Sequence, residues 1–487
     1  MPAKKTSAKR GRRPASGRRA AKATQGPGTV FIIDMIPKSL SNESSQDSEP
    51  HLTVNPANPQ QIVGTAFTPD PAGGAKAPIF ISSDGGLTWK LNSIVPSVPA
   101  SIGTGDITTG FSGKATTLYA GILNAGNSHL QFLRTANPFL PTPMAVLSDR
   151  PNADQPFTIA TKKGTRELVY IGDNDFNAPG GKTATVDESL NAGVPAPAFT
   201  SVRVEKRTTL GQDGPQTRPT SHPDGTVYAA FYRWRAGAGN FQANTFVVTS
   251  ADVIVVRDDH SGSGAGAFTA LIDPGDGLAG VRVVQGVSFP FMIHGTAVTG
   301  QQRLGGALSI AVDPQDSSTV YLAYGDKQPG SVLTLHVRVS KNRGQTWSAD
   351  CLTITNATNG ALAVTTGGVI GFLYQQLRGL GASQRWQTHL RRSKDGVNWS
   401  DLILADTPAT TPVKTFDPYL GDYDHLVANG TTFFGIFSAN NTPDKTHFPN
   451  GVVYQRNANF VTHKVLKLDG TTVVAPSIDP FFFKVTQ

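Results

Sequence analysis

Little in the sequence can cross-link the chain or anchor it in a membrane. Its 487 residues contain one cysteine, Cys351, and 16% of them are charged. A single cysteine excludes an internal disulfide framework and a cysteine-based metal cluster. The apolar run 30–33 ends at Asp34, and no stretch is long and apolar enough to span a bilayer. We therefore expect no conventional signal peptide, and a protein that is either cytoplasmic or exported by a non-classical route.

The first 33 positions contain no acidic residue, so the net charge of +8 is concentrated at the N-terminus. Residues 1–24 carry nine of the 43 lysines and arginines, which leaves 34 in the remainder against 35 acidic residues. Because residues 1–28 also lack aliphatic and aromatic side chains beyond Met1 and alanine, we expect them to form a disordered basic tail. Such a tail either binds a polyanion, namely nucleic acid or an anionic surface, or serves as a solubilising extension.

Long stretches with the apolar periodicity of helices are absent, whereas the sequence holds 51 glycines and 34 prolines. This composition predicts an all-β protein. An apolar strand, a short turn and a β-branched or aromatic strand recur as one unit. The seven copies of this unit cover residues 52–67, 107–123, 157–172, 219–232, 308–324, 361–374 and 424–437.

The period of these units is about fifty residues, with one longer step of 93. A period of this size predicts a single β-propeller of four-stranded blades over residues 29–487. Seven blades match the seven copies, and six blades are the alternative. The longer step predicts an insertion at about 258–306. Because propeller rings often close by pairing the two ends of the chain, we expect the same closure in this protein.

A second motif, which we call the Ser-Trp turn, places serine, aspartate or asparagine, glycine and tryptophan around a tight turn. An aspartate or asparagine oxygen accepts backbone N–H groups, glycine permits the chain to reverse, and the indole packs between strands. The motif therefore predicts a stapled hairpin. Its two full copies and one shorter copy are Ser82, Asp84, Gly86, Thr88 and Trp89; Ser340, Asn342, Gly344, Thr346 and Trp347; and Ser393, Asp395, Gly396 and Trp399.

The spacing of the Ser-Trp turns resembles the Asp-box, or bacterial neuraminidase (BNR) repeat, of sialidase-like β-propellers. The resemblance implies that the turns are structural hairpins that link the third and fourth strands of a blade, away from the ligand face. It also implies a ligand-binding propeller that recognises a carbohydrate.

A sialidase of this family would also need an arginine before the first box, and residues 30–81 contain none. This absence matters because lysine does not reproduce the guanidinium fork that holds an anionic substrate. Whether the protein is an enzyme therefore stays open. The alternatives to simple carbohydrate binding are an exo-sialidase-like glycoside hydrolase and a protein-interaction scaffold.

The first strands of propeller blades line the central channel, so the residues at which they start converge at one end. Four carboxylates there are candidates for acid, base or nucleophile in glycoside hydrolysis, or for bonding to backbone amides: Glu49, Asp106, Asp154 and Asp422. The candidate ligand-binding residues are Arg150, Arg218, Arg303, Tyr419 and Tyr423.

One segment begins like a calcium-binding loop. Its candidate ligands are Asp173, Asp175 and Asn177, but the glycine and the closing glutamate of such a loop are missing. We therefore expect no cofactor, with calcium as the alternative.

Because the positive charge lies in the tail and not in the predicted propeller, the two parts should act independently. Deleting residues 1–26 should leave folding and glycan binding intact and abolish only salt-sensitive binding to polyanions, because salt screens the contacts of such a tail. The measurement is the retention of full-length and truncated protein on heparin or DNA across a salt gradient. Equal retention of the two forms would place the polyanion site on the propeller instead.

Overall fold

The computed structural model describes most of the chain. The described residues are Met1, Ala243 and the ranges 28–67, 76–96, 104–124, 129–240, 245–291, 307–412 and 419–486. Residues 2–27 of the predicted basic tail and Arg303 therefore lie outside the described residues. None of the helices in the described ranges has the length and apolar character needed to cross a membrane.

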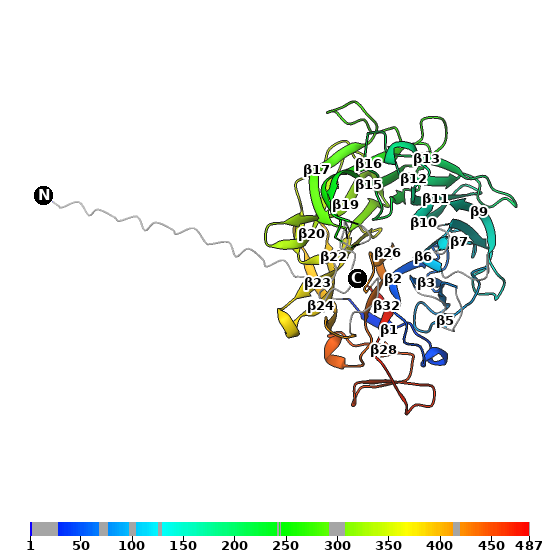
Figure 1. Cartoon of the computed structure of the whole chain (residues 1–487), viewed down its shortest axis with the longest axis vertical. Coiled ribbons are helices and arrows are strands. Elements are labelled where there is room, and N and C mark those ends of the chain that lie inside the picture. The colour runs from blue at the N-terminus through cyan, green and yellow to red at the C-terminus, as the bar shows by residue number, and fades with distance from the viewer. Residues whose placement is uncertain are drawn as a thin grey trace.

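Seven sheets of four or five strands form a ring in the described part of the chain (Figure 1). Each sheet is one blade. Blades 1 to 3 are formed by β2 (Ser48–Val54), β3 (Ile62–Phe67), β4 (Ile79–Ser82) and β5 (Lys90–Leu91); β6 (Thr104–Phe111), β7 (Leu118–Asn124), β8 (His129–Thr135) and β9 (Ala145–Pro151); and β10 (Ala153–Lys163), β11 (Arg166–Asp175), β12 (Ala184–Ser189) and β13 (Thr200–Arg203).

The remaining blades follow in chain order. Blades 4 to 6 are formed by β14 (Arg218–Ser221), β15 (Val227–Ala238), β16 (Val247–Asp258) and β17 (Val281–Pro290); β18 (Leu308–Asp313), β19 (Asp316–Gln328), β20 (Ser331–Ser340) and β21 (Leu352–Thr355); and β22 (Ala357–Val364), β23 (Ile370–Arg378), β24 (Arg385–Ser393) and β25 (Ser400–Pro408). Blade 7 is formed by β26 (His425–Asn429), β27 (Thr432–Asn440), β32 (Ile478–Val485), β1 (Val30–Asp34) and β28 (Val453–Tyr454).

Short elements decorate this ring. The segment of the chain between β28 and β32 forms a small sheet of three strands: β29 (Ala458–Asn459), β30 (Lys464–Leu466) and β31 (Val473–Val474). The helices of the described chain are single 3₁₀ turns: η1 (Lys38–Leu40), η2 (Pro179–Gly181), η3 (Gly381–Ser383) and η4 (Lys445–His447).

The seven predicted repeat units form the first two strands of the seven blades. The all-β propeller predicted from the period is thus confirmed, with seven blades rather than six in the described chain. Within the predicted insertion 258–306, residues 281–290 form β17, the fourth strand of blade 4. Residues 292–306 of that range lie outside the described residues.

Both ends of the chain meet in blade 7. Strand β1 pairs antiparallel with β32 from Val30 opposite Val485 to Asp34 opposite Phe481, and it pairs in parallel with β28 on its other side. In Figure 1 the blue β1 accordingly lies beside the red β32. The predicted closure of the ring by its two ends is therefore present.

Hydrophobic clusters fill every gap between neighbouring blades of the described ring. The gap between blades 7 and 1 holds Met35, Phe482 and Trp89, each nearly fully buried. Since one sheet cannot cover its own apolar faces, each blade depends on both of its neighbours for burial. The seam between blades 7 and 1 is packed like the other gaps.

The three Ser-Trp turns share one hydrogen-bond pattern and link the third and fourth strands of blades 1, 5 and 6. In the first copy Ser82 Oγ donates to Asp84 Oδ1 at 2.8 Å and accepts from Gly86 N at 2.9 Å. The indole N–H of Trp89 donates to the Gly86 carbonyl at 3.1 Å. The other copies repeat the glycine and tryptophan bonds at 2.9 Å and 3.1–3.2 Å. No turn residue lines the central cavity, so the turns hold blades together.

Gly86 gives a prediction about the seam. Its φ is 91°, and a Cβ atom there would lie 2.1 Å from the Phe482 ring of blade 7. The equivalent Gly396 has a φ of 72° and nothing within 4 Å of its Cβ position. Gly86→Ala should therefore lower the free energy of unfolding by about 2–5 kcal/mol, whereas Gly396→Ala should cost only about 1–2 kcal/mol of backbone strain. Denaturant unfolding of both variants measures the difference, and equal losses would contradict this packing of the seam.

Candidate functional site

Residues from all seven first strands line a cavity of about 260 Å³ at the centre of the ring. Most of its wall consists of small or β-branched residues such as Ala160, Ala311 and Ala363. Ionisable groups, namely Arg218, Asp424 and His425, occur where β14 and β26 begin. Hydroxyl side chains are spread along the wall: Thr53, Thr109, Thr158, Thr220 and Ser309. The cavity therefore has a mixed wall, with its ionisable residues at one end.

Irregular backbone recurs at this end. The pairing of the first and second strands shifts register in blades 1, 2, 3 and 6, each time placing two residues of the first strand opposite one residue of the second. The first of these two residues is Glu49, Gln155 or Asn359 in blades 1, 3 and 6, with φ of 50°, 57° and 56°. Such φ values are strained for residues that carry a Cβ, and bulges redirect neighbouring side chains. The repeated bulge sets how side chains are presented where the strands begin.

Arg218 is the charged centre of this end. Its side chain is buried, and its guanidinium carbon lies 4.1 Å from the centre of the Phe157 ring and 5.2 Å from that of Tyr423. Burial lowers the pKa of Arg218 to about 10 even though nearby acidic groups act to raise it, so the guanidinium is charged at neutral pH. We call Arg218 and these neighbours the Arg218 group: Glu49, Asp106, Asp422 and Tyr423.

Two hydrogen bonds connect distant parts of the sequence within the Arg218 group. The Tyr423 hydroxyl donates to Asp106 Oδ1 at 3.0 Å, and the Asp422 backbone N–H donates to Glu49 Oε1 at 3.2 Å. Burial, followed by the charge of Asp106, raises the pKa of Tyr423 well above its ordinary value. The phenol is therefore neutral and remains a hydrogen-bond donor.

Two histidines form a layer beneath Arg218. The rings of His51 and His425 stack with their centres 3.9 Å apart. Each is in a T-shaped arrangement with the Phe157 ring, with ring centres 5.4 and 5.5 Å apart. The Nδ1–H of His425 donates to the Leu52 carbonyl at 2.7 Å. Burial lowers the pKa of His51 well below its ordinary value and that of His425 to about 3. Both rings are therefore neutral near pH 7.

Two buried atoms of ionisable side chains whose residues line the cavity have no hydrogen-bond partner in the described structure. They are Nε of Arg218 and Oδ2 of Asp424. Asp424 is 2% exposed, and its Oδ1 accepts only a long bond of 3.4 Å from Ser438 N. Burial raises the pKa of Asp424 well above its ordinary value, which favours the neutral carboxyl group. Buried polar atoms are normally paired, so two unpaired polar atoms beside one cavity mark a place for a polar ligand or water.

The structure does not bring the other predicted site residues to the Arg218 group. Arg150 lies beside Asp173 at 3.4 Å and Asp175 at 2.8 Å, and it also contacts Asp187. A guanidinium thus sits against two of the three residues predicted as a calcium-loop start. The third, Asn177, donates from its backbone N to Asp175 Oδ1 at 2.9 Å.

Asp154 and Tyr419 have contacts with residues outside the Arg218 group. Asp154 Oδ1 accepts from the backbone N of Gln155 at 2.6 Å, and its charge acts on Asp173. Tyr419 packs in a separate hydrophobic cluster with Trp386 and Ile478.

Sequence reasoning did not single out His51, His425 and Phe157. A signal for them exists, because His51 and Phe157 each directly follow a Glu-Pro or Gln-Pro pair at the bulge of their blade. Alignment of the repeats at the bulge, rather than at the second strand, places both residues at the same position.

Comparisons with known proteins give matches only at the level of structure. No protein-family model matches the chain, and no characterised protein matches it in sequence. The GH93 α-L-arabinofuranosidase of Fusarium graminearum in complex with arabinobiose is 12% identical with a TM-score of 0.39, and the match covers 93% of this chain and 98% of that one. The Hadza microbial sialidase Hz136 is 12% identical with a TM-score of 0.37, covering 82% and 65%.

A third structure, YCF48 bound to a D1 peptide, is 10% identical with a TM-score of 0.38, covering 84% of this chain and 96% of that one. At these identities and scores the chemistry of the site must be argued from its own residues.

Proposed function

We propose that the protein is a sialidase-like, Asp-box propeller that binds a carbohydrate at the Arg218 end of the central cavity. The observation that carries this proposal is the pair of buried, unpaired polar atoms on residues that line the cavity, Nε of Arg218 and Oδ2 of Asp424. A sugar hydroxyl both donates and accepts hydrogen bonds, so adjacent hydroxyls satisfy a donor and an acceptor together.

The surroundings of these atoms suit a small polar ligand. A cavity of about 260 Å³ is near the lower end of the range of ligand pockets. The ring of Phe157 supports the guanidinium from one face, and the neutral Tyr423 holds Asp106 through its hydroxyl. The charged groups are therefore already oriented before a ligand arrives, which reduces the entropy lost on binding.

Leaving a buried polar atom unpaired costs about 1–3 kcal/mol. A ligand that pairs with both Arg218 and Asp424 recovers this free energy on binding. The surrounding low dielectric strengthens each new charge-assisted hydrogen bond. Affinity should therefore depend on the guanidinium fork and not on positive charge alone.

Glycoside hydrolysis is a second candidate function. Its support is the hydrogen bond of 3.0 Å between the Tyr423 hydroxyl and Asp106. A carboxylate at this distance can accept the proton of the Tyr423 hydroxyl when that oxygen attacks the sugar. Glu49 and Asp422 are further carboxylates of the same group. The distinguishing observation is turnover that depends on Asp106. A protein-interaction scaffold is the remaining alternative, and it requires neither glycan binding nor turnover.

The proposal predicts a specific effect of Arg218→Lys. The substitution keeps the positive charge but removes the planar fork, so the affinity for a glycan found on an array should fall at least tenfold, or about 1.4 kcal/mol. Arg235→Lys is the matched control, because the Arg235 side chain is 45% exposed and pairs with Asp252 on blade 4. Thermal unfolding of both variants establishes that they are folded.

The same array is run beside a panel of aryl glycosides with wild-type protein and Asp106→Asn. Binding without turnover supports carbohydrate recognition alone, and turnover lost in Asp106→Asn supports hydrolysis. Glycan binding that is equal in wild type and Arg218→Lys would contradict the proposed site. The absence of both binding and turnover would leave the scaffold function.

A further inference from the structure

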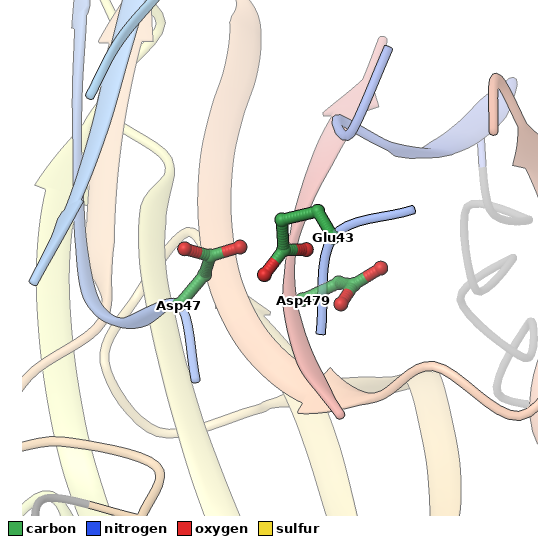
Figure 2. A group of neighbouring side chains, drawn as sticks. All are labelled: Glu43, Asp47 and Asp479. Atoms are coloured by element: carbon green, nitrogen blue, oxygen red, sulfur yellow. The ribbon is translucent and has the colours of Figure 1, made fainter. Parts of the chain in front are cut away.

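A second group of carboxylates lies at the seam where the ring closes. Glu43 and Asp47 belong to the segment between η1 and β2, whereas Asp479 lies on β32 near the C-terminus. One oxygen of each lies within 4.8 Å of the others. Figure 2 shows the Glu43 side chain reaching between the two aspartates. We call these three residues the seam cluster.

The seam cluster brings together more carboxyl groups than the basic group beside it can pair with. Glu43, Asp47 and Asp479 are 6%, 0% and 0% exposed, and the fully buried Asp34 adds a fourth carboxylate beside Asp479. The positive charge that faces them is that of Arg456, 2.6 Å from Asp479 Oδ2 and 3.6 Å from Glu43 Oε2. Four buried carboxyl groups beside one guanidinium require further neutralisation, by bound protons or by a cation, since unpaired charge is expensive to bury.

The side chain of Asp47 is an independent sign of a ligand. Both oxygens of Asp479 already have partners, because Oδ1 accepts from Asn441 at 2.8 Å and Ser477 at 3.0 Å while Oδ2 binds Arg456. Each carboxylate oxygen has two lone pairs, so Oδ2 can still ligate an ion. By contrast, neither oxygen of Asp47 has a hydrogen-bond partner among the described residues, and Oε2 of Glu43 has none either. Asp47 is thus a fully buried carboxyl group with two unpaired oxygens, and its side chain points toward that of Glu43 (Figure 2).

We propose that Glu43, Asp47 and Asp479 bind a calcium ion. The available donors are all carboxylate oxygens, which are the ligands that hard divalent cations prefer. Calcium bonds to oxygen at about 2.3–2.6 Å, so two ligands on opposite sides of the ion lie about 5 Å apart. The three oxygens lie within 4.8 Å of one another, which is inside that span.

A cation at this place would tie the segment before blade 1 to the strand that closes blade 7. Asp479 lies on β32, which pairs with β1, and Arg456 also contacts the backbone carbonyls of Ser41 and Glu43. A ligand that binds the folded state and not the unfolded state raises stability by mass action. Calcium should therefore stabilise ring closure without contacting the Arg218 group.

The test uses full-length protein that has been treated with a chelator and dialysed. Titration with calcium should show one binding site and raise the midpoint of thermal unfolding by about 3 °C or more at saturation. Terbium should replace calcium and give luminescence sensitised by Tyr454, whose phenol is close enough to feel the charges of Asp34 and Asp479.

Asp47→Asn and Glu43→Gln should each weaken calcium binding at least tenfold and remove the thermal shift. Because each variant removes one buried negative charge and keeps the side-chain shape, folding should survive. Glu188→Gln is the matched control, since Glu188 is a buried glutamate of blade 3 away from the seam, and it should keep the full response. An unchanged unfolding midpoint in wild type with and without calcium, or equal calcium binding by Asp47→Asn, would overturn the proposal.

Discussion

The pairing of β1 with β32 joins the two ends of the chain, and the ring depends on it. Five residues of β1 pair with residues of β32, although the two strands lie at opposite ends of the propeller sequence. Without this pairing, blade 7 would lose two of its strands and the apolar faces at the seam would meet water. Each hydrophobic cluster bridges two blades, so exposing one seam weakens the burial of the blades on both sides.

Closure also determines the chemistry at the centre of the ring. Glu49 of blade 1 meets the backbone of Asp422 before blade 7, and Asp106 of blade 2 meets Tyr423, across 373 and 317 residues of sequence. These contacts exist only if blade 7 returns to the position beside blade 1. The guanidinium of Arg218 then lies among carboxylates contributed from both ends of the chain. The seam cluster has the same origin, because its residues come from the first and last parts of the propeller.

Features that depend on neighbours in sequence were predictable, and those that depend on packing were not. The repeat units indicated seven pairs of strands, because they are a local pattern. The resemblance of the Ser-Trp turns to the Asp-box implied that they join third and fourth strands. Convergence of first strands predicted that Asp106, Arg218 and Tyr423 would lie together. The positions of Arg150 and Tyr419 depend on contacts with β11, β12 and a separate apolar cluster, which spacing along the chain does not encode.

Native-state hydrogen exchange of the full-length protein tests the closure of the ring most directly. If β1 is an integral strand of blade 7, peptides that cover Val30–Asp34 and Ile478–Val485 should exchange at the same slow rate as the first strands of the blades, because their amides open only with the ring. Rapid exchange of β1 while β32 remains protected would contradict the account, since the ring would then be closed without its N-terminal strand.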